Sequence, residues 1–237
     1  MQCLFPELIV YHDAAAHSAA MNMAIDEALL EHVTVPAIRF YRWQSPALSF
    51  GYFGRFADVA SYENERDLVR RWTGGGIVFH GEDLTYSIVI PASDTAFTES
   101  TISIYEKIHR ALVEALADAG QFAVVAGVAD PSPRSATTEM GRAAIIDRGY
   151  SCFENAVRAD VMSDGRKIAG AAQRRTRCGL LQQGSIQGVE VGNGLGEGFA
   201  GALSTICSER EIDDAILNRA GLLVQQKYGM QNWLRRR

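Results

Sequence analysis

The chain has 237 residues, of which 47% are hydrophobic and 22% are charged, and a chain of this size and composition can bury one large core. We therefore expect a single domain that spans residues 1–237. The formal net charge of −5 excludes a general attraction to nucleic acid or to an anionic membrane, because either would require an excess of Lys and Arg.

The four cysteines, Cys3, Cys152, Cys178 and Cys207, lie far apart and lack CxxC spacing. The sequence therefore predicts neither a metal site nor a disulfide framework. No stretch approaches 18 uninterrupted apolar residues, and the first residues lack a positively charged leader. We expect a cytoplasmic protein without a membrane span.

The first part of the chain predicts strands around one helix. A strand over Leu8–His12 precedes an amphipathic helix over Ser18–Val33, which begins at a serine cap. Two alternating stretches, Ala37–Trp43 and Ala47–Phe53, are separated by the turn signal Gln-Ser-Pro and predict a hairpin. Two further strands are predicted at 77–80 and 84–91, joined by the turn Gly-Glu-Asp.

The second part predicts a helix over Ser100–Ala119 that stops at Gly120. Residues 130–149 are rich in Pro, Ser, Thr and Gly and predict a long loop, for which a lid is one function. Two strands are predicted around the turn 163–165 and another at 179–188. The tail from residue 208 predicts helix with a basic end.

The stretch "RRWTGGGIVFHGEDLTYS" begins at Arg70 and Arg71 and contains the consecutive glycines Gly74, Gly75 and Gly76. Glycines let a ligand lie against backbone N–H groups. The spacing matches neither the dinucleotide fingerprint nor the phosphate loop. The two arginines can bind a phosphate or carboxylate, to which Thr73 and His80 add donors. A tight bend with surface arginines and a core histidine is the structural alternative.

Lys167 and Cys152 form a second group of candidate residues. The lysine precedes the small apolar stretch Ile-Ala-Gly-Ala-Ala, so its amine can reach a pocket and polarise a carbonyl. Cys152 stands between the long loop and a strand, where a thiol can react as a thiolate. The alternatives are a solvated lysine at a strand edge and a buried, inert cysteine.

Five stretches in a fixed order resemble the biotin/lipoate protein ligase superfamily, in its lipoate ligase and octanoyltransferase branch. They are "NMAIDEALL", "IRFYRWQSPALSFGYF", "RRWTGGGIVFHGEDLTYS", "GRKIAGAAQRR" with "LLQQGSI", and "QQKYGMQNW". The resemblance covers nearly the whole chain. It implies an α+β fold, with a mixed, mostly antiparallel sheet flanked by helices and a channel for an eight-carbon acyl chain. It also implies one catalytic domain without a C-terminal accessory domain.

Two chemistries occur in that branch. Lipoate ligases activate free lipoate with ATP and Mg²⁺ to form lipoyl-AMP, whereas octanoyltransferases need no such cofactor and take octanoate from an acyl carrier protein through a cysteine thioester. The position of Cys152 ahead of "GRKIAGAAQ" resembles the cysteine-bearing octanoyltransferases. Ala159-Asp160 stands where ligases tend to have Asn-Asp, and "QQG" (182–184) replaces a histidine-containing stretch. These departures favour the transferase over the ligase. The transferases often have a histidine at this place too, so the glutamine at position 183 puts in doubt any role assigned there.

The resemblance therefore implies that Cys152 attacks the carrier-bound octanoyl or lipoyl thioester and that Lys167 stabilises the oxyanion. The residues expected to contact the substrates are Arg70, Arg71, Thr73, Gly74, Gly75, Gly76, His80, Asp160, Gly170 and Gln183. The expected acceptors are lysines of lipoyl-domain proteins, such as the glycine cleavage H protein and 2-oxoacid dehydrogenase E2 subunits. An ATP-dependent ligase and a non-catalytic acyl- or carrier-binding module are the alternatives.

Overall fold

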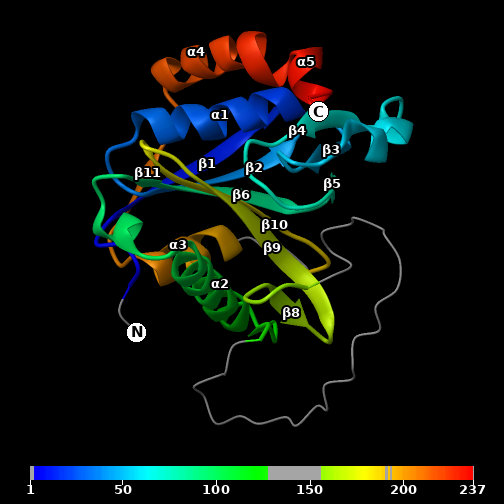
Figure 1. The fold of residues 1–237 in the computed structure, drawn as a ribbon. Coiled ribbons are helices and arrows are strands. Elements are labelled where there is room, and N and C mark those ends of the chain that lie inside the picture. Colours follow the sequence, from blue (N-terminus) through cyan, green and yellow to red (C-terminus); the bar gives the residue numbers. More distant parts are fainter. Residues whose placement is uncertain (1–2, 128–155, 190–191, 193, 237) are drawn as a thin grey trace.

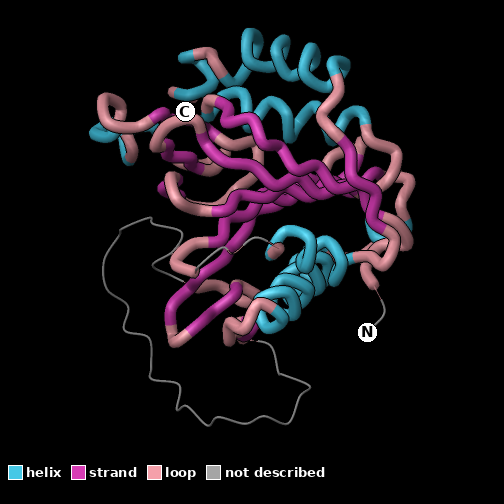
Figure 2. Tube along the Cα trace, turned by 180° about the vertical axis from the view of Figure 1, so that it is seen from behind, coloured by secondary structure: helices cyan, strands magenta, loops and turns pink. Residues whose placement is uncertain are grey.

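The computed structural model describes residues 3–127, 156–189, 192 and 194–236, and these form two β-sheets with helices on both sides (Figures 1 and 2). The large sheet has the order β11-β1-β2-β6-β10-β9-β8-β7. Its strands are β1 (Leu8–His17), β2 (Ala37–Trp43), β6 (Leu84–Pro91), β7 (Val124–Val125), β8 (Val161–Ser163), β9 (Arg166–Arg175), β10 (Gly179–Ile186) and β11 (Cys207–Arg210). The small sheet has the order β4-β3-β5, with β3 (Ala47–Phe50), β4 (Asp67–Arg70) and β5 (Val78–His80).

Helices cover both faces of the large sheet. In Figure 1, α1 (Ala19–His32), α4 (Asp214–Leu223) and α5 (Gln231–Leu234) lie above it, and α2 (Thr101–Asp118) and α3 (Leu195–Leu203) lie below it. The β1 strand pairs in parallel with β2 and β11, and the other pairs in this sheet are antiparallel. The predicted α+β class with a mixed, mostly antiparallel sheet is thus confirmed. No helix in the described part of the chain is long and apolar enough to span a bilayer.

Serine caps begin the two long helices, and the sequence predicts the first of them, at Ser18. The Ser18 hydroxyl accepts a hydrogen bond from the Met21 N–H, and the Ser100 hydroxyl accepts one from the Ser103 N–H. Each cap satisfies an N–H group that the first helical turn leaves without a partner. Beyond the end of α2, Gly120 adopts a φ of 77°, a conformation that favours glycine. Both predicted helices are confirmed.

The predicted hairpin over Ala37–Trp43 and Ala47–Phe53 is wrong. The first stretch, β2, pairs with β1 and β6 of the large sheet, while β3 pairs with β4 and β5 of the small one. Nearly every residue of β2 is buried, so this strand needs neighbours on both edges and layers on both faces. The residues between β2 and β3 therefore carry the chain from one sheet into the other.

Other predicted boundaries shift where tertiary pairing decides the structure. The strands at 77–80 and 84–91 form as β5 and β6 but belong to different sheets, and the turn 163–165 joins β8 to β9 as expected. Residues 207–210 form β11 beside β1, although the tail from 208 was expected to be helical throughout. The α3 helix was not predicted, and the expected loop at 130–149 lies outside the described residues.

A buried polar network joins α1 to the large sheet. The Asp26 carboxylate, fully buried, accepts hydrogen bonds at one oxygen from Arg39 Nη1 at 2.8 Å and Ser87 Oγ at 2.7 Å. Its other oxygen accepts from Tyr41 Oη at 3.0 Å and Gln183 Nε2 at 2.7 Å. Since these partners lie on β2, β6 and β10, the network fixes the position of α1 over three strands.

Removal of the Arg39 side chain would leave the Asp26 carboxylate buried without its cation. We expect Arg39→Ala to lower the free energy of unfolding by about 3–5 kcal/mol, measured by urea denaturation. As a control, Arg219→Ala removes a pair with Glu31 in which both side chains are 32% exposed, and should cost at most about 1 kcal/mol. Equal losses in the two variants would contradict the role given to the network.

Candidate active site

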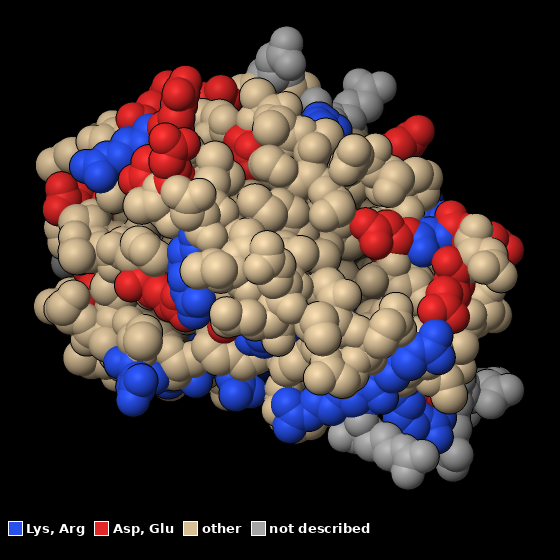
Figure 3. Space-filling model, turned by 90° about the horizontal axis from the view of Figure 1, so that it is seen from above, with Lys and Arg blue, Asp and Glu red and all other residues tan. Residues whose placement is uncertain are grey.

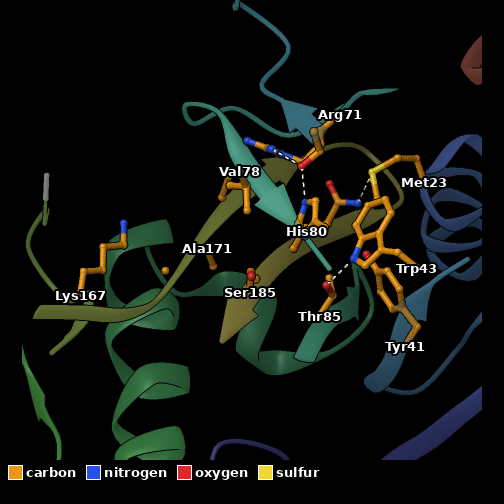
Figure 4. A pocket seen from close by; sticks show the side chains of 15 residues that line it. Met23, Tyr41, Trp43, Arg71, Val78, His80, Thr85, Lys167, Ala171 and Ser185 are labelled. Atoms are coloured by element: carbon orange, nitrogen blue, oxygen red, sulfur yellow. Dashed lines mark hydrogen bonds between the residues drawn. The ribbon is translucent and has the colours of Figure 1, made fainter. Parts of the chain in front are cut away.

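A pocket opens between the two sheets, with its walls drawn from α1, β2, β3, β5, β6, β9 and β10 (Figure 4). Its apolar lining consists of Met23, Tyr41, Trp43, Val78, Ala171 and Ala172. Its polar lining consists of Ser49, Arg71, His80, Thr85, Lys167, Gln183 and Ser185, with Gly170 and Gly184 between them. Lys167 lies at the opposite end of the pocket from the rings of Tyr41 and Trp43. The pocket therefore has an apolar end and a cationic end.

Lys167 at the cationic end is held by a buried carboxylate. Its Nζ lies 2.8 Å from Oδ2 of Asp160, and the two side chains are 4% and 0% exposed. A Cβ added at Gly170 would lie 2.5 Å from Lys167 Cε and 2.6 Å from Nζ. Because such distances are too short for any real Cβ, glycine at position 170 is what allows the lysine to lie across its own strand.

Several groups hold Asp160 in place. Tyr105 on α2 donates to Oδ1 at 2.6 Å, and the Val157 N–H donates to Oδ2 at 2.7 Å. The preceding residue, Ala159, has a φ of 71°, which is a strained conformation for alanine and easier for asparagine. Its carbonyl accepts a hydrogen bond from Nδ1 of the fully buried His109. The α2 helix thus supports the backbone that presents Asp160 to Lys167.

His80 lies in the wall of the pocket between a carboxylate and a hydroxyl. Its Nδ1 lies 2.8 Å from Asp83 Oδ2, so Nδ1 carries the proton and Nε2 accepts from Ser49 Oγ at 2.7 Å. The imidazole stacks on Trp43 with ring centroids 4.0 Å apart. Burial lowers the pKa of His80, which keeps the ring neutral near pH 7.

Asp83 also accepts hydrogen bonds from Thr85, Ser185 and the Gly81 N–H. Burial alone would raise the pKa of the Asp83 carboxyl, but hydrogen bonds from His80, Ser185 and Gly81 bring it below its usual value. Asp83 is therefore an anion that fixes three side chains of the pocket wall. Asp83, Ser49 and Trp43 belong to no motif in the sequence that predicts their place in this wall.

The three glycines meet the chain's own backbone. A Cβ at Gly51 would lie 2.1 Å from the Gly75 carbonyl oxygen, so the two glycine-containing loops pack directly against each other. Gly75 has a φ of 83°, which favours glycine. Arg71 donates to the carbonyls of Gly74 and Gly76 and, through Nη1, to Ser49 Oγ at 2.6 Å. Arg71 thus ties the glycine loop to the pocket, whereas Gly75 and Gly76 line a separate hollow beside Phe53.

Arg70 points away from the pocket. It is 1% exposed, and its five N–H groups donate to main-chain carbonyls, which are those of Tyr52, Gly54, Trp233, Leu234 and Arg236. The guanidinium therefore joins the loop after β3 to the C-terminal helix. This contact replaces the expected one with a substrate or carrier, because no donor of Arg70 remains for a phosphate.

Thr73 is fully buried and donates to Oε1 of Gln183 at 2.8 Å, while Gln183 Nε2 donates to Asp26. The Gln183 amide, which lines the pocket, is thus fixed by hydrogen bonds at both its oxygen and its nitrogen. Of the predicted site residues, the structure brings Arg71, His80, Gly170 and Gln183 together around the pocket with Lys167 and its partner Asp160. It places Arg70, Thr73 and the three glycines outside the lining, and Cys152 lies outside the described residues.

Among the residues that the structure describes, no group of three or more His, Cys, Asp and Glu side chains could hold a metal ion. The polar groups of the pocket are instead directed at one another through hydrogen bonds. Its chemistry in the described part of the chain is thus that of an amine, a neutral imidazole and hydroxyl groups beside an apolar cavity.

The buried His109 makes the free energy of unfolding depend on pH. Burial lowers its pKa from 6.5 to about 4, so the folded protein keeps this ring neutral while the unfolded chain takes up a proton. His109 therefore does not lower the free energy of unfolding above pH 6.5, but it lowers this free energy progressively as the pH falls towards 4. In urea denaturations across this range, His109→Gln should reduce the slope of unfolding free energy against pH by up to about 1.4 kcal/mol per unit. The carboxylates and His80 remain in both proteins, so identical slopes would refute the assignment.

Comparisons with known proteins assign the family. Residues 18–188 match the model of the lipoyl protein ligase A/B catalytic domain. The protein named octanoyltransferase LipM of Staphylococcus aureus is 35% identical over 173 residues, which are 70% of this chain and 60% of that protein. The octanoyltransferase LipM of Symbiobacterium thermophilum is 30% identical over 90% of this chain and 92% of its own length. The chain thus spans about 60% of the length of the first of these relatives.

Solved structures support the same fold. The putative lipoate protein ligase Ta0514 from T. acidophilum with bound lipoic acid superposes with a TM-score of 0.71 at 21% identity, over 98% of both chains. A lipoate-protein ligase A bound with ATP gives the same score, identity and coverage. At this identity the likeness concerns the fold alone. From the match to more than half of its residues, the chain belongs to the lipoyl protein ligase A/B catalytic domain family.

Proposed function

We propose that the protein is an octanoyltransferase of lipoate biosynthesis, which moves an octanoyl or lipoyl group from a carrier protein to a lysine of a lipoyl domain through a thioester on Cys152. Family membership and the relatives named octanoyltransferase support this assignment. The structural observation that carries it is the Lys167–Asp160 pair, since it holds an amine at one end of an otherwise largely apolar pocket.

In the first half-reaction the acyl chain occupies the apolar end, beside Met23, Tyr41 and Trp43, and its thioester carbonyl lies beside Lys167. The Cys152 thiol loses its proton and attacks the carbonyl carbon as a thiolate, the bond from that carbon to the donor sulfur breaks, and the proton given up by Cys152 passes to the donor sulfur, which leaves as a thiol. Lys167 Nζ donates to the oxyanion, and a donor of this kind lowers the barrier by about 3 kcal/mol.

In the second half-reaction the amine of the acceptor lysine attacks the acyl-enzyme. An amide forms, the bond to Cys152 breaks, and the proton of the amine passes to the leaving thiolate. Asp160 acts by positioning Lys167, and Gln183 by closing the pocket between α1 and β10. A covalent intermediate of this kind predicts ping-pong kinetics.

The transferase reaction uses no ATP. Arg70, which was expected to contact a phosphate, instead donates to main-chain carbonyls, and the structural relatives include a ligase bound with ATP. Lipoyl-domain proteins such as the glycine cleavage H protein and E2 subunits are the proposed acceptors. The cytoplasmic location and the absence of an accessory domain stay predictions.

The test is the intact mass of the purified protein after incubation with octanoyl-acyl carrier protein in the absence of ATP. We expect an octanoyl adduct on the unaltered protein and none on Cys152→Ala, because only the thiol can form the thioester. No adduct, together with ATP-dependent labelling of a lipoyl domain by free lipoate, would make the protein a ligase. Binding of octanoate without either reaction would make it a non-catalytic module.

Gly170→Ala tests the position of Lys167 without altering the lysine itself. The new Cβ must displace the far end of that flexible side chain, so we expect kcat/KM for octanoyl transfer, measured well below the Tm of the variant, to fall about 10²- to 10³-fold. The shift of the amine from the buried Asp160 should also lower Tm. Gly201→Ala is the matched control, because its Cβ would meet nothing within 4 Å. Wild-type kcat/KM in Gly170→Ala would show that the amine need not lie across the strand.

A further inference from the structure

Four aromatic rings form a platform beside the C-terminal helices, defined by Tyr52, Trp72, Tyr228 and Trp233. The Trp233 ring centroid lies 5.8 Å from that of Tyr52 and 5.9 Å from that of Tyr228. Because its members come from the loop after β3, the glycine loop and the C-terminal region, the platform joins segments far apart in sequence.

Three cations, here called the cation cluster, rest on these rings. Arg174 lies 5.1 Å from the Tyr52 centroid and 5.2 Å from that of Trp72. Lys227 lies 4.2 Å from Trp72, and Arg236 lies 4.6 Å from Tyr52. Since Arg174 and Arg236 share the Tyr52 ring and Arg174 and Lys227 share the Trp72 ring, three positive charges are concentrated on one surface.

Two of these charges lack a counter-ion. Lys227 pairs with Glu27, but no carboxylate in the described parts of the chain forms an ion pair with Arg174 or Arg236. Other arginines are neutralised, as Arg39 is by Asp26 and Asp13 and Arg219 is by Glu31. In Figure 3, Lys and Arg gather along one edge of the face seen from above, while Asp and Glu lie on the opposite side and beside one end of this edge. A chain of net charge −5 thus keeps a local excess of positive charge.

The cation cluster begins at the rim of the pocket. Gly170, Ala172 and Arg174 alternate along β9, so their side-chain positions share one face of the strand, and the first two line the pocket. Trp72 directly follows the pocket-lining Arg71. A molecule bound on Arg174 is therefore two residues along β9 from the pocket-lining Ala172.

An exposed apolar side chain completes this surface. Phe53 is 84% exposed, and its ring packs edge-on against Tyr52 with centroids 5.0 Å apart. A rigid aromatic ring beside uncompensated arginines has the composition of an interface centre, which combines an apolar anchor with charge complementarity.

We propose that the cation cluster and Phe53 form the docking surface for an acidic protein, namely the carrier that delivers the acyl donor. This inference rests on the proposed transferase function. The donor reaches the pocket through a flexible thioester arm with a phosphodiester, so an anionic arm and an acidic protein surface both meet the arginines. The acceptor presents its lysine on a much shorter side chain and has no such anionic arm, which favours the donor as the occupant.

The test measures binding separately from turnover. The ligand is a carrier protein whose octanoyl group is attached through an amide, which cannot be transferred, and its Kd is measured by fluorescence anisotropy at several salt concentrations. We expect the double variant Arg174→Glu/Arg236→Glu to raise Kd at least about tenfold and to flatten its salt dependence, since charge reversal at a rim removes electrostatic attraction. Phe53→Ala should raise Kd without changing the salt dependence.

Arg210→Glu is the matched control, because Arg210 is an exposed arginine on β11 at the other edge of the large sheet. It should leave Kd unchanged. For the double variant, KM for octanoyl-pantetheine, which has neither phosphate nor protein, should also stay at the wild-type value.

A wild-type Kd for the carrier in the double variant would overturn the proposal, as would an equal rise in KM for octanoyl-pantetheine. A defect confined to transfer from the acyl-enzyme to a lipoyl domain would overturn the assignment to the donor. Because the amide-linked carrier cannot react, the Kd measurement is independent of the thioester test of the proposed function, whereas the KM and transfer measurements apply only once that test has succeeded.

Discussion

The fold depends on one ion pair buried between α1 and the large sheet. Asp26 and Arg39 are each 0% exposed, and removing two charges from water is unfavourable unless every lone pair and donor finds a partner. Arg39 meets this condition with Asp13 and Asn22 in addition to Asp26. The strands and the helix that supply these groups must therefore assemble in one register, which makes the pair a constraint on the architecture.

The same network extends to the pocket. Asp26 accepts a hydrogen bond from the Gln183 amide and so orients it. The amide oxygen of Gln183 in turn accepts a hydrogen bond from the hydroxyl of Thr73, which lies in the segment that leads into the glycine loop. Arg71, in that segment, connects the loop to Ser49 and so to His80. The polar wall of the pocket is thus continuous with the interior of the protein. Its neutral imidazole and oriented amide are preorganised by folding, before any acyl chain enters.

Local signals in the sequence predict much of this structure, and long-range pairing decides the rest. Serine caps and helical periodicity are sufficient to place α1 and α2, but the separation of β2 from β3 depends on β1, β4, β5 and β6, which no turn signal reports. Two adjacent residues show the same limit of prediction from local sequence. Arg70 and Arg71 look equivalent in sequence, yet one binds C-terminal carbonyls and the other faces the pocket. The resemblance indicates Lys167 and Asp160 as separate site residues, whereas their ion pair and the Ser49–His80–Asp83 contacts emerge only from the fold, the latter through the β3–β5 pairing.

Arg70 has a consequence for the order of folding. Its guanidinium donates to the Leu234 carbonyl, 164 residues further along the chain. During synthesis, the small sheet therefore leaves the ribosome long before the carbonyls that satisfy its buried cation. Until those carbonyls arrive, Arg70 must stay hydrated, which keeps the loop after β3 open to water. We therefore expect completion of the small sheet to be a late step, because the buried guanidinium of Arg70 is satisfied only when the C-terminal carbonyls dock.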